Sequence, residues 1–366
     1  MPSPPRDPRD KPIGGHREPY EAHCPHFPSC VGCSFINVPY PEQLLRKREI
    51  VRRAFAEYAS LAAVEVPEVR PSPERLGYRA RVKLVVRRKR GDIAVGLYVP
   101  QSHRVIDISS CPIHPRPVNQ VIYYLKKKIL ELGIIPYDER NDSGELRYVD
   151  FRYSFARKEL SITLVTRHNF LPQGEALADA LHHRYPFITG VIQNINEQQG
   201  NVIWGDKYKT LGGRDTLMER IGDLKMVFPP GVFSQANPFT ARKLYEHVRA
   251  LANLTGTETV LDLYCGVGPI SLFLALGARQ VWAVDDSELS ITTAKQNSRR
   301  NGRGNCRFVA GDVAATLRQW RQSLPNIDLI ALNPPRKGVQ AAAMTELVAI
   351  GAPKLIYVSC EPQSLA

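Results

Sequence analysis

The segment from Thr259 to Asp285 constrains the fold most strongly, because its pattern predicts a strand, a helix and a second strand in succession. The apolar residues Val260, Leu261 and Leu263 predict a buried strand. A glycine-rich turn follows, residues 269–276 predict a helix, and residues 281–284 predict a second buried strand. Two parallel strands joined through a helix are the building unit of a doubly wound α/β sheet. We therefore expect this region to form such a sheet.

The residues of this turn indicate which nucleotide the sheet would bind. Glycine at position 266 lets the backbone approach a ligand closely, and Asp285, 19 residues after Gly266, is spaced to hold a pair of ribose hydroxyls. A dinucleotide site would carry a third glycine where this chain has Ser271, and Asp262 would repel phosphate but can face a cationic amino-acid group. The pattern therefore favours S-adenosylmethionine (SAM) over NAD. The alternative is the same turn in an unrelated doubly wound fold.

The charge balance of the chain indicates a polyanionic partner. The 366 residues carry a formal net charge of +13, which favours nucleic acid, although a basic surface without such a role is the alternative. The length allows two or three domains. No run of about 18 uncharged apolar residues is present, and the Pro- and Arg-rich N-terminus has no apolar core. We therefore expect a cytoplasmic protein that is a monomer and has no membrane partner.

Four of the seven cysteines form a pattern typical of a metal site. They are Cys24, Cys30, Cys33 and Cys111. In a chain without an export signal, such cysteines are more often metal ligands than disulfides. Four thiolates fit an iron–sulfur cluster or zinc, and the spacing alone does not separate the two. His23 and His26 could bind zinc, but flanking histidines are more often bystanders, and a cluster without a metal is the remaining alternative.

Changes of pattern along the chain predict four segments. Residues 1–20 predict a disordered tail, and residues 21–70 carry the first three cysteines and a basic amphipathic helix at 41–62. Residues 71–222 predict a central α+β RNA-binding domain that includes Cys111, and residues 223–366 predict the SAM-binding domain.

Alternating basic and apolar residues support the central domain. Strands are expected at residues 79–87, 93–99, 150–155, 160–166, 190–196 and 202–205, and helices at 118–132 and 174–183. Aromatic residues are interleaved with the basic ones, namely Tyr78, Tyr148, Tyr153 and Phe155. Such strands suit phosphate contact and base stacking, and an ordinary sheet surface is the alternative.

Further strands predicted at 306–310, 328–332 and 354–359 complete the doubly wound sheet. Ligands of such sheets bind at the carboxyl ends of the strands. Six residues are expected there: Asp262, Gly266, Asp285, Asp312, Asn333 and Cys360. Asp312 could accept from an adenine amino group or cap a helix. The loop at 228–237 places the polar Gln235 among apolar residues, which also favours a ligand site.

A cysteine at the end of the last of these strands suggests covalent catalysis. C5 of uracil is a poor nucleophile, but addition of a thiolate at C6 makes an enolate that can attack a methyl group. Asn333 is placed to hydrogen-bond the pyrimidine edge, and Arg336 could hold phosphate or lower the pKa of the Cys360 thiol. The target base must be flipped out to be reached. The alternative for Cys360 is a buried thiol that only packs, as we expect for Cys265 and Cys306.

Over about residues 24–366 the chain resembles the bacterial RNA 5-methyluridine methyltransferases, in particular the iron–sulfur 23S rRNA members RlmC and RlmD. The motifs are the four cysteines, Phe233-Ser-Gln-Ala-Asn, Asp262-Leu-Tyr-Cys-Gly-Val-Gly, Asn333-Pro-Pro-Arg and Tyr357-Val-Ser-Cys. The resemblance implies a class I SAM-dependent methyltransferase fold and a [4Fe–4S] cluster on the four cysteines. It implies that Gln235, Tyr264, Asp285 and Asn333 bind the donor, with Gly266 and Asp312 beside them. Phe233, Asn333 and Arg336 are expected to contact the RNA, and Cys360 is expected to be the nucleophile.

Two departures from the family pattern qualify this expectation. Position 361 is Glu where the family usually has Asn, and no residue here matches the glutamate base that the family places some tens of residues beyond Ala366. We therefore expect the sheet to lack the family's last strands, and the chain to form the adduct poorly or to release it poorly. A uridine of 23S rRNA is the expected target, with tRNA as the alternative. Two different functions also fit the motifs: a non-enzymatic iron–sulfur RNA-binding protein, and an amino-group methyltransferase, against which Arg336 argues.

Overall fold

The computed structural model of the 366-residue chain describes residues 24–89, 91–200, 202–321 and 324–366. The predicted tail and His23 lie outside these ranges. The chain divides into two compact units. Unit 1 contains the described parts of residues 1–47, 68–153 and 159–215, and unit 2 contains those of residues 48–67, 154–158 and 216–366. Among the described residues, no helix has the length and apolar character needed to cross a bilayer.

Unit 1 contains a seven-stranded mixed sheet in the order β3-β2-β1-β4-β5-β6-β7. The strands are β1 (Arg81–Lys89), β2 (Asp92–Tyr98), β3 (Val105–Asp107), β4 (Leu146–Ser154), β5 (Glu159–Thr166), β6 (Ile188–Ile195) and β7 (Lys207–Gly213). The alternation predicted for β1 holds only at its start, where Val82 and Leu84 are buried and Lys83 between them is exposed, because Val85 further along is buried as well. In the central strands β4, β5 and β6, side chains at nearly all consecutive positions are buried, so both faces of the sheet are covered there.

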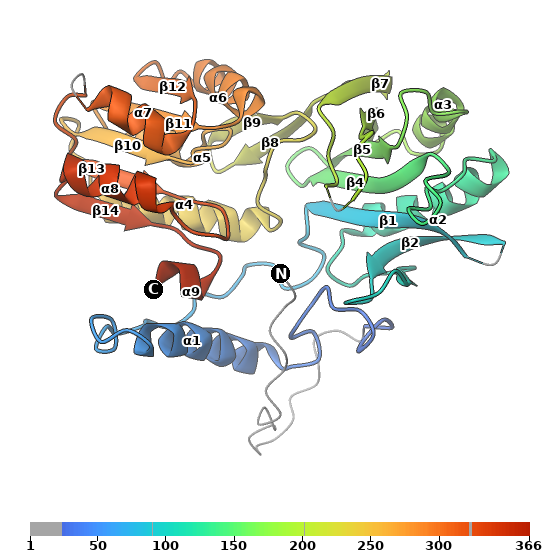
Figure 1. Cartoon of the computed structure of the whole chain (residues 1–366), viewed down its shortest axis with the longest axis horizontal. Coiled ribbons are helices and arrows are strands. Elements are labelled where there is room, and N and C mark those ends of the chain that lie inside the picture. Colours follow the sequence, from blue (N-terminus) through green and yellow to red (C-terminus); the bar gives the residue numbers. More distant parts are fainter. Residues whose placement is uncertain (1–23, 90, 201, 322–323) are drawn as a thin grey trace. The chain divides into compact units, whose positions relative to one another are not determined.

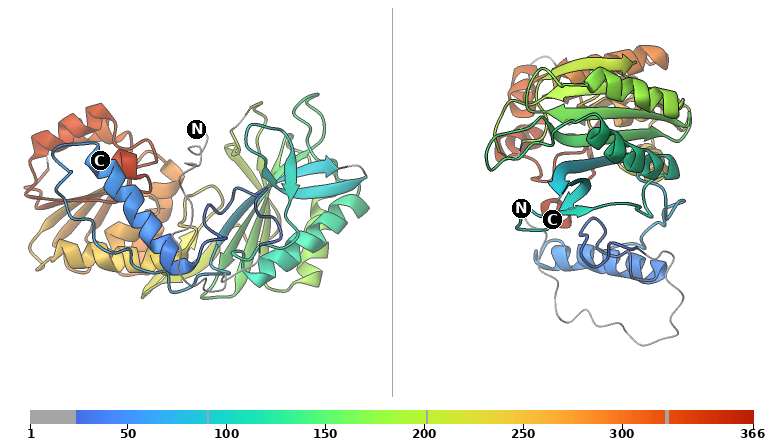
Figure 2. Two further views of the ribbon diagram at one scale, coloured as in Figure 1. Left: turned by 90° about the horizontal axis from the view of Figure 1, so that it is seen from below. Right: turned by 90° about the vertical axis from the view of Figure 1, so that its right-hand side faces the viewer.

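Two helices cover one face of this sheet, α2 (Arg116–Glu131) and α3 (Gly174–Arg184) (Figure 2). On α2, Val118, Val121, Ile122, Leu125 and Ile129 are buried at helical spacing. The first helix of the chain, α1 (Tyr40–Ala56), ends earlier than the predicted residue 62, because the chain turns there as Tyr58 N donates to Phe55 O.

The predicted strand at residues 202–205 is wrong. Side chains at and just after the end of β6 bind the backbone of this segment: Asn196 Nδ2 donates to Val202 O at 2.7 Å, and Gly205 N donates to Asn194 Oδ1 at 3.0 Å. Backbone groups bonded in this way cannot also form a ladder. The edge strand β7 therefore begins only at Lys207.

Unit 2 contains a five-stranded sheet in the order β12-β11-β10-β13-β14, in which every neighbouring pair is parallel (Figure 1). The strands are β10 (Thr259–Leu263), β11 (Gln280–Asp285), β12 (Cys306–Ala310), β13 (Leu329–Leu332) and β14 (Lys354–Tyr357). The chain order reverses between β10 and β13, so this is the predicted doubly wound α/β fold. The point of reversal is where such sheets bind ligands.

Helices cover both faces of this sheet and make two cores. One core joins the sheet to α4 (Pro238–Ala252), α5 (Pro269–Leu274) and α6 (Glu288–Arg300), with Tyr245 and Phe273 packed against Val260 and Val281. The other core joins it to α7 (Val313–Trp320) and α8 (Ala341–Ile350). Unit 2 has three further elements. Strands β8 (Leu217–Ile221) and β9 (Leu224–Phe228) form a separate antiparallel hairpin, and the short helix α9 (Pro362–Leu365) follows β14.

Candidate active site at the strand ends of unit 2

The carboxyl ends of the central strands meet at one edge of the unit 2 sheet. Leu263 is paired with Val284 on one side and with Leu332 on the other. Leu332 is in turn paired with Tyr357, the last residue of β14. The backbone continues these pairings by one step, because Asn333 N donates to Leu263 O at 3.3 Å and Val358 N donates to Leu332 O at 2.9 Å. The residues that follow each strand therefore lie together, as the sequence predicted.

The glycine-rich turn after β10 is held to the end of β11 by a carboxylate. Gly266 N donates to Asp285 Oδ2 at 2.8 Å, and Ser287 N donates to Asp285 Oδ1 at 3.1 Å. Burial raises the pKa of Asp285, while these two amides oppose that effect. Gly266 has φ +55°, and a Cβ placed there would meet no atom within 4 Å. The turn is therefore open to a ligand on the side of Gly266.

Asp262 lies beneath this turn, with no exposed surface. Its Oδ2 accepts from Ser271 Oγ at 2.5 Å, so the serine that replaces the third glycine binds the acid. Its Oδ1 is buried without a hydrogen-bond partner among the described residues. Burial raises the pKa of Asp262 to about 7, and the nearby Asp285 charge adds to this. Asp262 is thus placed to support the turn, and a ligand contact would reach it only at Oδ1.

Cys360 is exposed, three residues past the end of β14. A network of hydrogen bonds fixes the turn that carries it: Ser359 Oγ donates to Glu361 O at 2.8 Å and lies 3.1 Å from Ser364 Oγ. Tyr357 OH donates to Ser364 O at 3.2 Å, which ties α9 back to β14. The thiol therefore lies on a braced turn and is not a packing residue of the core. The neighbouring Glu361 begins α9.

The remaining predicted residues lie around the same edge of unit 2 or in its loops. Tyr264 is half-buried with φ +59°, and burial raises its pKa, with smaller contributions from Asp312 and Tyr357. Asp312 caps α7, because its Oδ1 accepts from Ala315 N at 2.9 Å. The side chains of Gln235 and Asn333 are half-buried, and neither has a hydrogen-bond partner in the described part of the chain.

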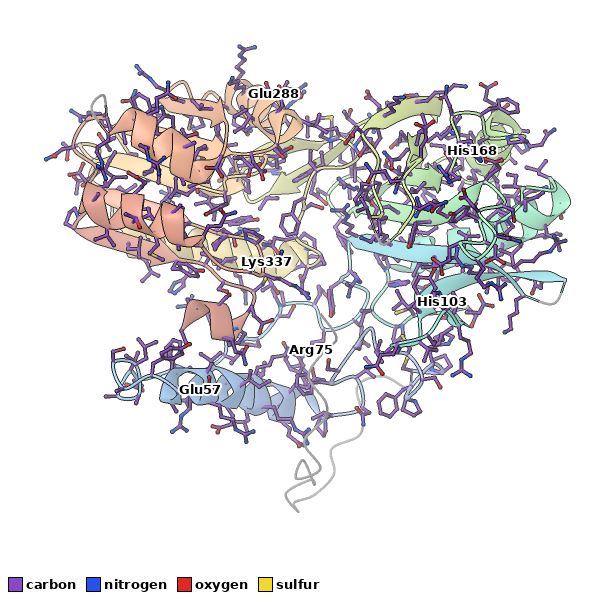
Figure 3. All side chains as sticks on the ribbon, in the orientation of Figure 1. Glu57, Arg75, His103, His168, Glu288 and Lys337 are labelled. Atoms are coloured by element: carbon purple, nitrogen blue, oxygen red, sulfur yellow. The ribbon has the colours of Figure 1, made fainter. Side chains whose placement is uncertain are left out.

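Two predicted RNA contacts are exposed. Phe233 has 63% of its surface exposed, and Arg336 is exposed in the loop after β13, beside Lys337 (Figure 3). By contrast, Cys265 is buried and Cys306 half-buried in the core under α5 and α6. Burial raises the pKa of Cys306 to about 12. These two thiols are thus packing residues, as expected, and Cys360 is the exposed thiol of unit 2 in the described residues.

The four predicted metal-ligand cysteines all lie in unit 1. His26 Nε2 lies 3.1 Å from Ser110 O, which joins the segment of the first three cysteines to the loop of Cys111. Burial and then the neighbouring Cys111 raise the pKa of Cys33 to about 11. Four cysteine thiols are the right type of ligand for a four-sulfur metal site. In the described ranges, however, no three His, Cys, Asp or Glu side chains are placed to hold a metal ion, so the geometry does not assemble the site.

A comparison with protein families identifies the chain. The model of the tRNA (uracil-5-)-methyltransferase family matches residues 39–366. The chain belongs to this family. An uncharacterized RNA methyltransferase of Halalkalibacterium halodurans is 36% identical over 346 residues, which cover 94% of this chain and 76% of the relative. One of Geobacter sulfurreducens is 38% identical over 343 residues, covering 94% of this chain and 69% of the relative.

A solved structure extends this RNA uracil-5 methyltransferase likeness to the fold. The Pyrococcus abyssi tRNA (uracil-54, C5)-methyltransferase, in complex with S-adenosyl-L-homocysteine, has a TM-score of 0.73 and 26% identity. The match covers 92% of this chain and 78% of that chain. The chain is therefore a SAM-dependent RNA uracil-5 methyltransferase. The open face at Gly266 and the Asp285 carboxylate fit a nucleoside-bearing methyl donor, as do the side-chain amides of Gln235 and Asn333, which have no partner among the described residues.

Sequence reasoning missed the residues that position the nucleophile. Ser359 and Ser364 form the turn around Cys360, and Gly338 approaches it so closely that a Cβ would meet Ser364 Cβ at 3.3 Å. In the sequence, only Ser359, directly before Cys360, could have indicated this turn. Ser364 and Gly338 carried no such signal, because their roles arise only when the loops after β13 and β14 meet.

Proposed function

We propose that this protein methylates C5 of a specific uridine in RNA through a covalent bond between Cys360 and C6 of the base. The observation that carries the proposal is the exposed thiol on a braced turn, next to the strand that delivers Asn333. A nucleophile must be accessible and a positioning group must lie beside it. The exposure of Cys360 and the pairing of β13 with β14 support both conditions.

The donor contacts follow from the chemistry of each side chain. The Asp285 carboxylate is suited to the ribose hydroxyls, and the open side of Gly266 to the nucleoside itself. Asp312 uses Oδ1 for the helix cap, and its Oδ2 is suited to the adenine amino group. Tyr264 and Gln235 complete the set. SAM supplies a methyl group activated by its positive sulfur.

The RNA contacts are proposed for the exposed and polar groups nearby. The ring of Phe233 offers a stacking surface for an unpaired base. The Asn333 carboxamide can both donate to and accept from the uracil edge, and the Arg336 guanidinium can bind a phosphate. A base flipped out of its stack would meet these groups together with the thiol.

The reaction balances as follows. The Cys360 thiolate adds to C6, forming an S–C6 bond and moving an electron pair towards C5. C5 then bonds the methyl carbon, the bond from that carbon to the positive sulfur breaks, and S-adenosylhomocysteine is left. Loss of the C5 proton to a base returns the electron pair, breaks the S–C6 bond and releases 5-methyluridine. No step passes through the cysteines of unit 1.

We propose a uridine of 23S rRNA as the target, in the cytoplasm. The resemblance of the four cysteines and of Asn333-Pro-Pro-Arg to the rRNA-modifying members supports this choice. tRNA is the second candidate, because the Pyrococcus abyssi protein is named for a tRNA uracil. The two candidates can be separated with equimolar rRNA and tRNA transcripts, each mixed with the protein and SAM. The class that forms the covalent complex with the protein is the substrate.

We propose further that Cys24, Cys30, Cys33 and Cys111 bind a [4Fe–4S] cluster with a structural role, with zinc as the alternative. Their spacing and the charge coupling of Cys33 to Cys111 support the proposal. Metal binding and local folding are coupled, so the ligands can be drawn together when the metal binds.

The test is covalent capture with RNA that carries 5-fluorouridine. Fluorine cannot leave C5 as a cation, so methyl transfer ends in an adduct that no base can resolve. We expect a protein–RNA adduct that survives denaturation, requires SAM and is lost in Cys360→Ser. An adduct that forms equally in Cys360→Ser would refute the proposal, and the absence of any adduct would favour a non-enzymatic RNA-binding protein.

A further inference from the structure

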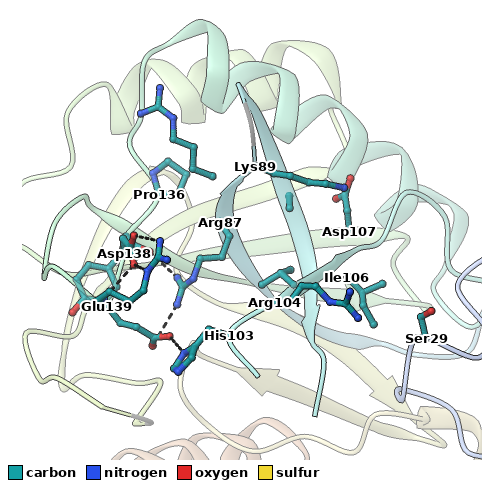
Figure 4. Close-up of a pocket in the computed structure, with 15 residues that line it drawn as sticks. Ser29, Arg87, Lys89, His103, Arg104, Ile106, Asp107, Pro136, Asp138 and Glu139 are labelled. Atoms are coloured by element: carbon teal, nitrogen blue, oxygen red, sulfur yellow. Dashed lines mark hydrogen bonds and ion pairs between the residues drawn. The ribbon is translucent and has the colours of Figure 1, made fainter. Parts of the chain in front are cut away.

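Unit 1 contains a pocket of about 1040 Å³ at the end of the hairpin formed by β1 and β2 (Figure 4). Its walls include apolar side chains of Ala94, Val105, Ile106 and Pro136. Five cationic side chains and one histidine line it: Arg87, Arg88, Lys89, Arg104, Arg140 and His103. Nothing in the proposed methyl transfer uses this pocket.

The acids of the pocket are already paired. Glu139 lies 2.6 Å from His103 Nδ1 and 3.4 Å from an Arg87 nitrogen, as the dashed lines of Figure 4 mark. Asp138 pairs with Arg140 at 2.7 Å. The third acid, Asp107, pairs at 2.5 Å with Lys126 of α2, which does not line the pocket.

Three cations of the lining remain without a counter-charge. The side chains of Arg88, Lys89 and Arg104 are exposed, and none has an ion-pair or hydrogen-bond partner in the described ranges. They come from two separate segments, the end of β1 and the loop before β3, so the fold brings them to one pocket. Unpaired cations around a concave surface concentrate a positive field and attract anions.

The pairing of the acids indicates which kind of ion this pocket can bind. A multivalent metal would need free carboxylates, which the described lining does not offer. Two guanidinium groups and an ammonium suit phosphate oxygens. Because they come from two segments around a pocket of about 1040 Å³, they suit successive phosphates of a chain better than one small ion.

We propose that this pocket binds phosphates of the RNA substrate, as an anchoring site separate from the strand ends of unit 2. The inference rests on the proposed function for the identity of the polyanion. Such contacts position RNA and contribute affinity without reading its sequence. The site is therefore expected to act on every RNA that the enzyme binds.

The test compares two triple variants of the full protein in unit 1. The first is Arg88→Gln, Lys89→Gln, Arg104→Gln, and the second, with the same change of charge outside the pocket, is Arg116→Gln, Lys127→Gln, Lys207→Gln. RNA affinity is measured over a range of KCl concentrations, and thermal melts and S-adenosylhomocysteine affinity verify that each variant is folded.

The pocket variant is expected to lower the slope of log affinity against log salt by about 2, since each lost phosphate contact to a single strand removes roughly 0.7. The control variant is expected to keep a slope much closer to that of the unsubstituted protein. Equal slopes and affinities for the two variants would overturn the inference. Capture of 5-fluorouridine RNA by the unsubstituted protein reports on the proposed function separately, because it depends on Cys360 and not on this slope.

Discussion

The backbone amide of Gly266 donates to Oδ2 of Asp285 over 2.8 Å, which links the glycine-rich turn after β10 to the end of β11. The same carboxylate accepts from Ser287 N at 3.1 Å, so two donors fix its orientation. A carboxylate held in this way can receive a ribose hydroxyl pair without reorganising. This preorganisation supports the proposal that Asp285 binds the methyl donor.

Substitution of Asp285 by Ala should weaken S-adenosylhomocysteine binding by about 10- to 100-fold, the loss expected for hydrogen bonds to a charged group. Isothermal titration calorimetry of the purified variant measures this. Glu288→Ala is the control, because Glu288 is an exposed acid at the start of α6 (Figure 3) and should change the affinity little. Equal losses in both variants would count against a ribose contact.

Gly266→Ala should abolish donor binding at a modest cost in stability. The Cβ enters the open space in front of the turn, and φ +55° costs an alanine about 1 kcal/mol. Gly302→Ala is the matched control, with φ +63° and likewise no atom within 4 Å of its Cβ. Both variants should lose similar thermal stability, and only Gly266→Ala should lose S-adenosylhomocysteine affinity. Retained affinity in Gly266→Ala would contradict this assignment.

The buried Asp262 predicts a pH dependence of stability in the ligand-free protein. Its pKa is raised from 3.8 to about 7 in the folded state, so the folded protein keeps a proton that the unfolded chain releases. The stability that this group contributes is therefore present at low pH and is lost as the pH rises from about 4 to about 7. Asp262→Asn cannot ionise, so its melting temperature relative to the unsubstituted protein should rise between about pH 4 and about pH 7 and stay level above that. A difference that is constant with pH would refute the assignment.

The four-cysteine proposal predicts bound metal in protein purified without oxygen. Iron with acid-labile sulfide is expected, or zinc in the alternative, and Cys111→Ser should lower the metal content to background because one of four ligands is lost. Cys306→Ala, in the core of unit 2, should keep the metal. Full occupancy in Cys111→Ser would exclude that thiol as a ligand.

The sequence predicted unit 2 well because its signals are local. Each parallel strand is a short apolar run, and the polar residue after it marks the end, so the edge that gathers Asp285, Asn333 and Cys360 follows from the chain order alone. The strand predicted at 202–205 failed because Asn194 and Asn196 bind that backbone from the neighbouring strand, which no local pattern reveals. The turn around Cys360 was missed for the same reason, since Ser359 and Ser364 meet only after α9 folds back.

The cysteine pattern shows what residue spacing alone does not predict. Spacing predicts a donor set, and the four thiols do lie in one unit. Ligand geometry, however, depends on distances of a few tenths of an ångström, which spacing does not determine. The basic pocket was also not predicted, because Arg88 and Arg104 belong to different segments that only the β1–β2–β3 arrangement brings together.

The most direct measurement is to map the adduct formed with 5-fluorouridine RNA and SAM by mass spectrometry of the digested protein. The account predicts a single modified peptide with the methylated fluorouridine on Cys360, and no adduct when SAM is left out or when Cys360 is Ser. An adduct on another residue, such as Cys265 or Cys306, or one that forms in Cys360→Ser, would contradict it.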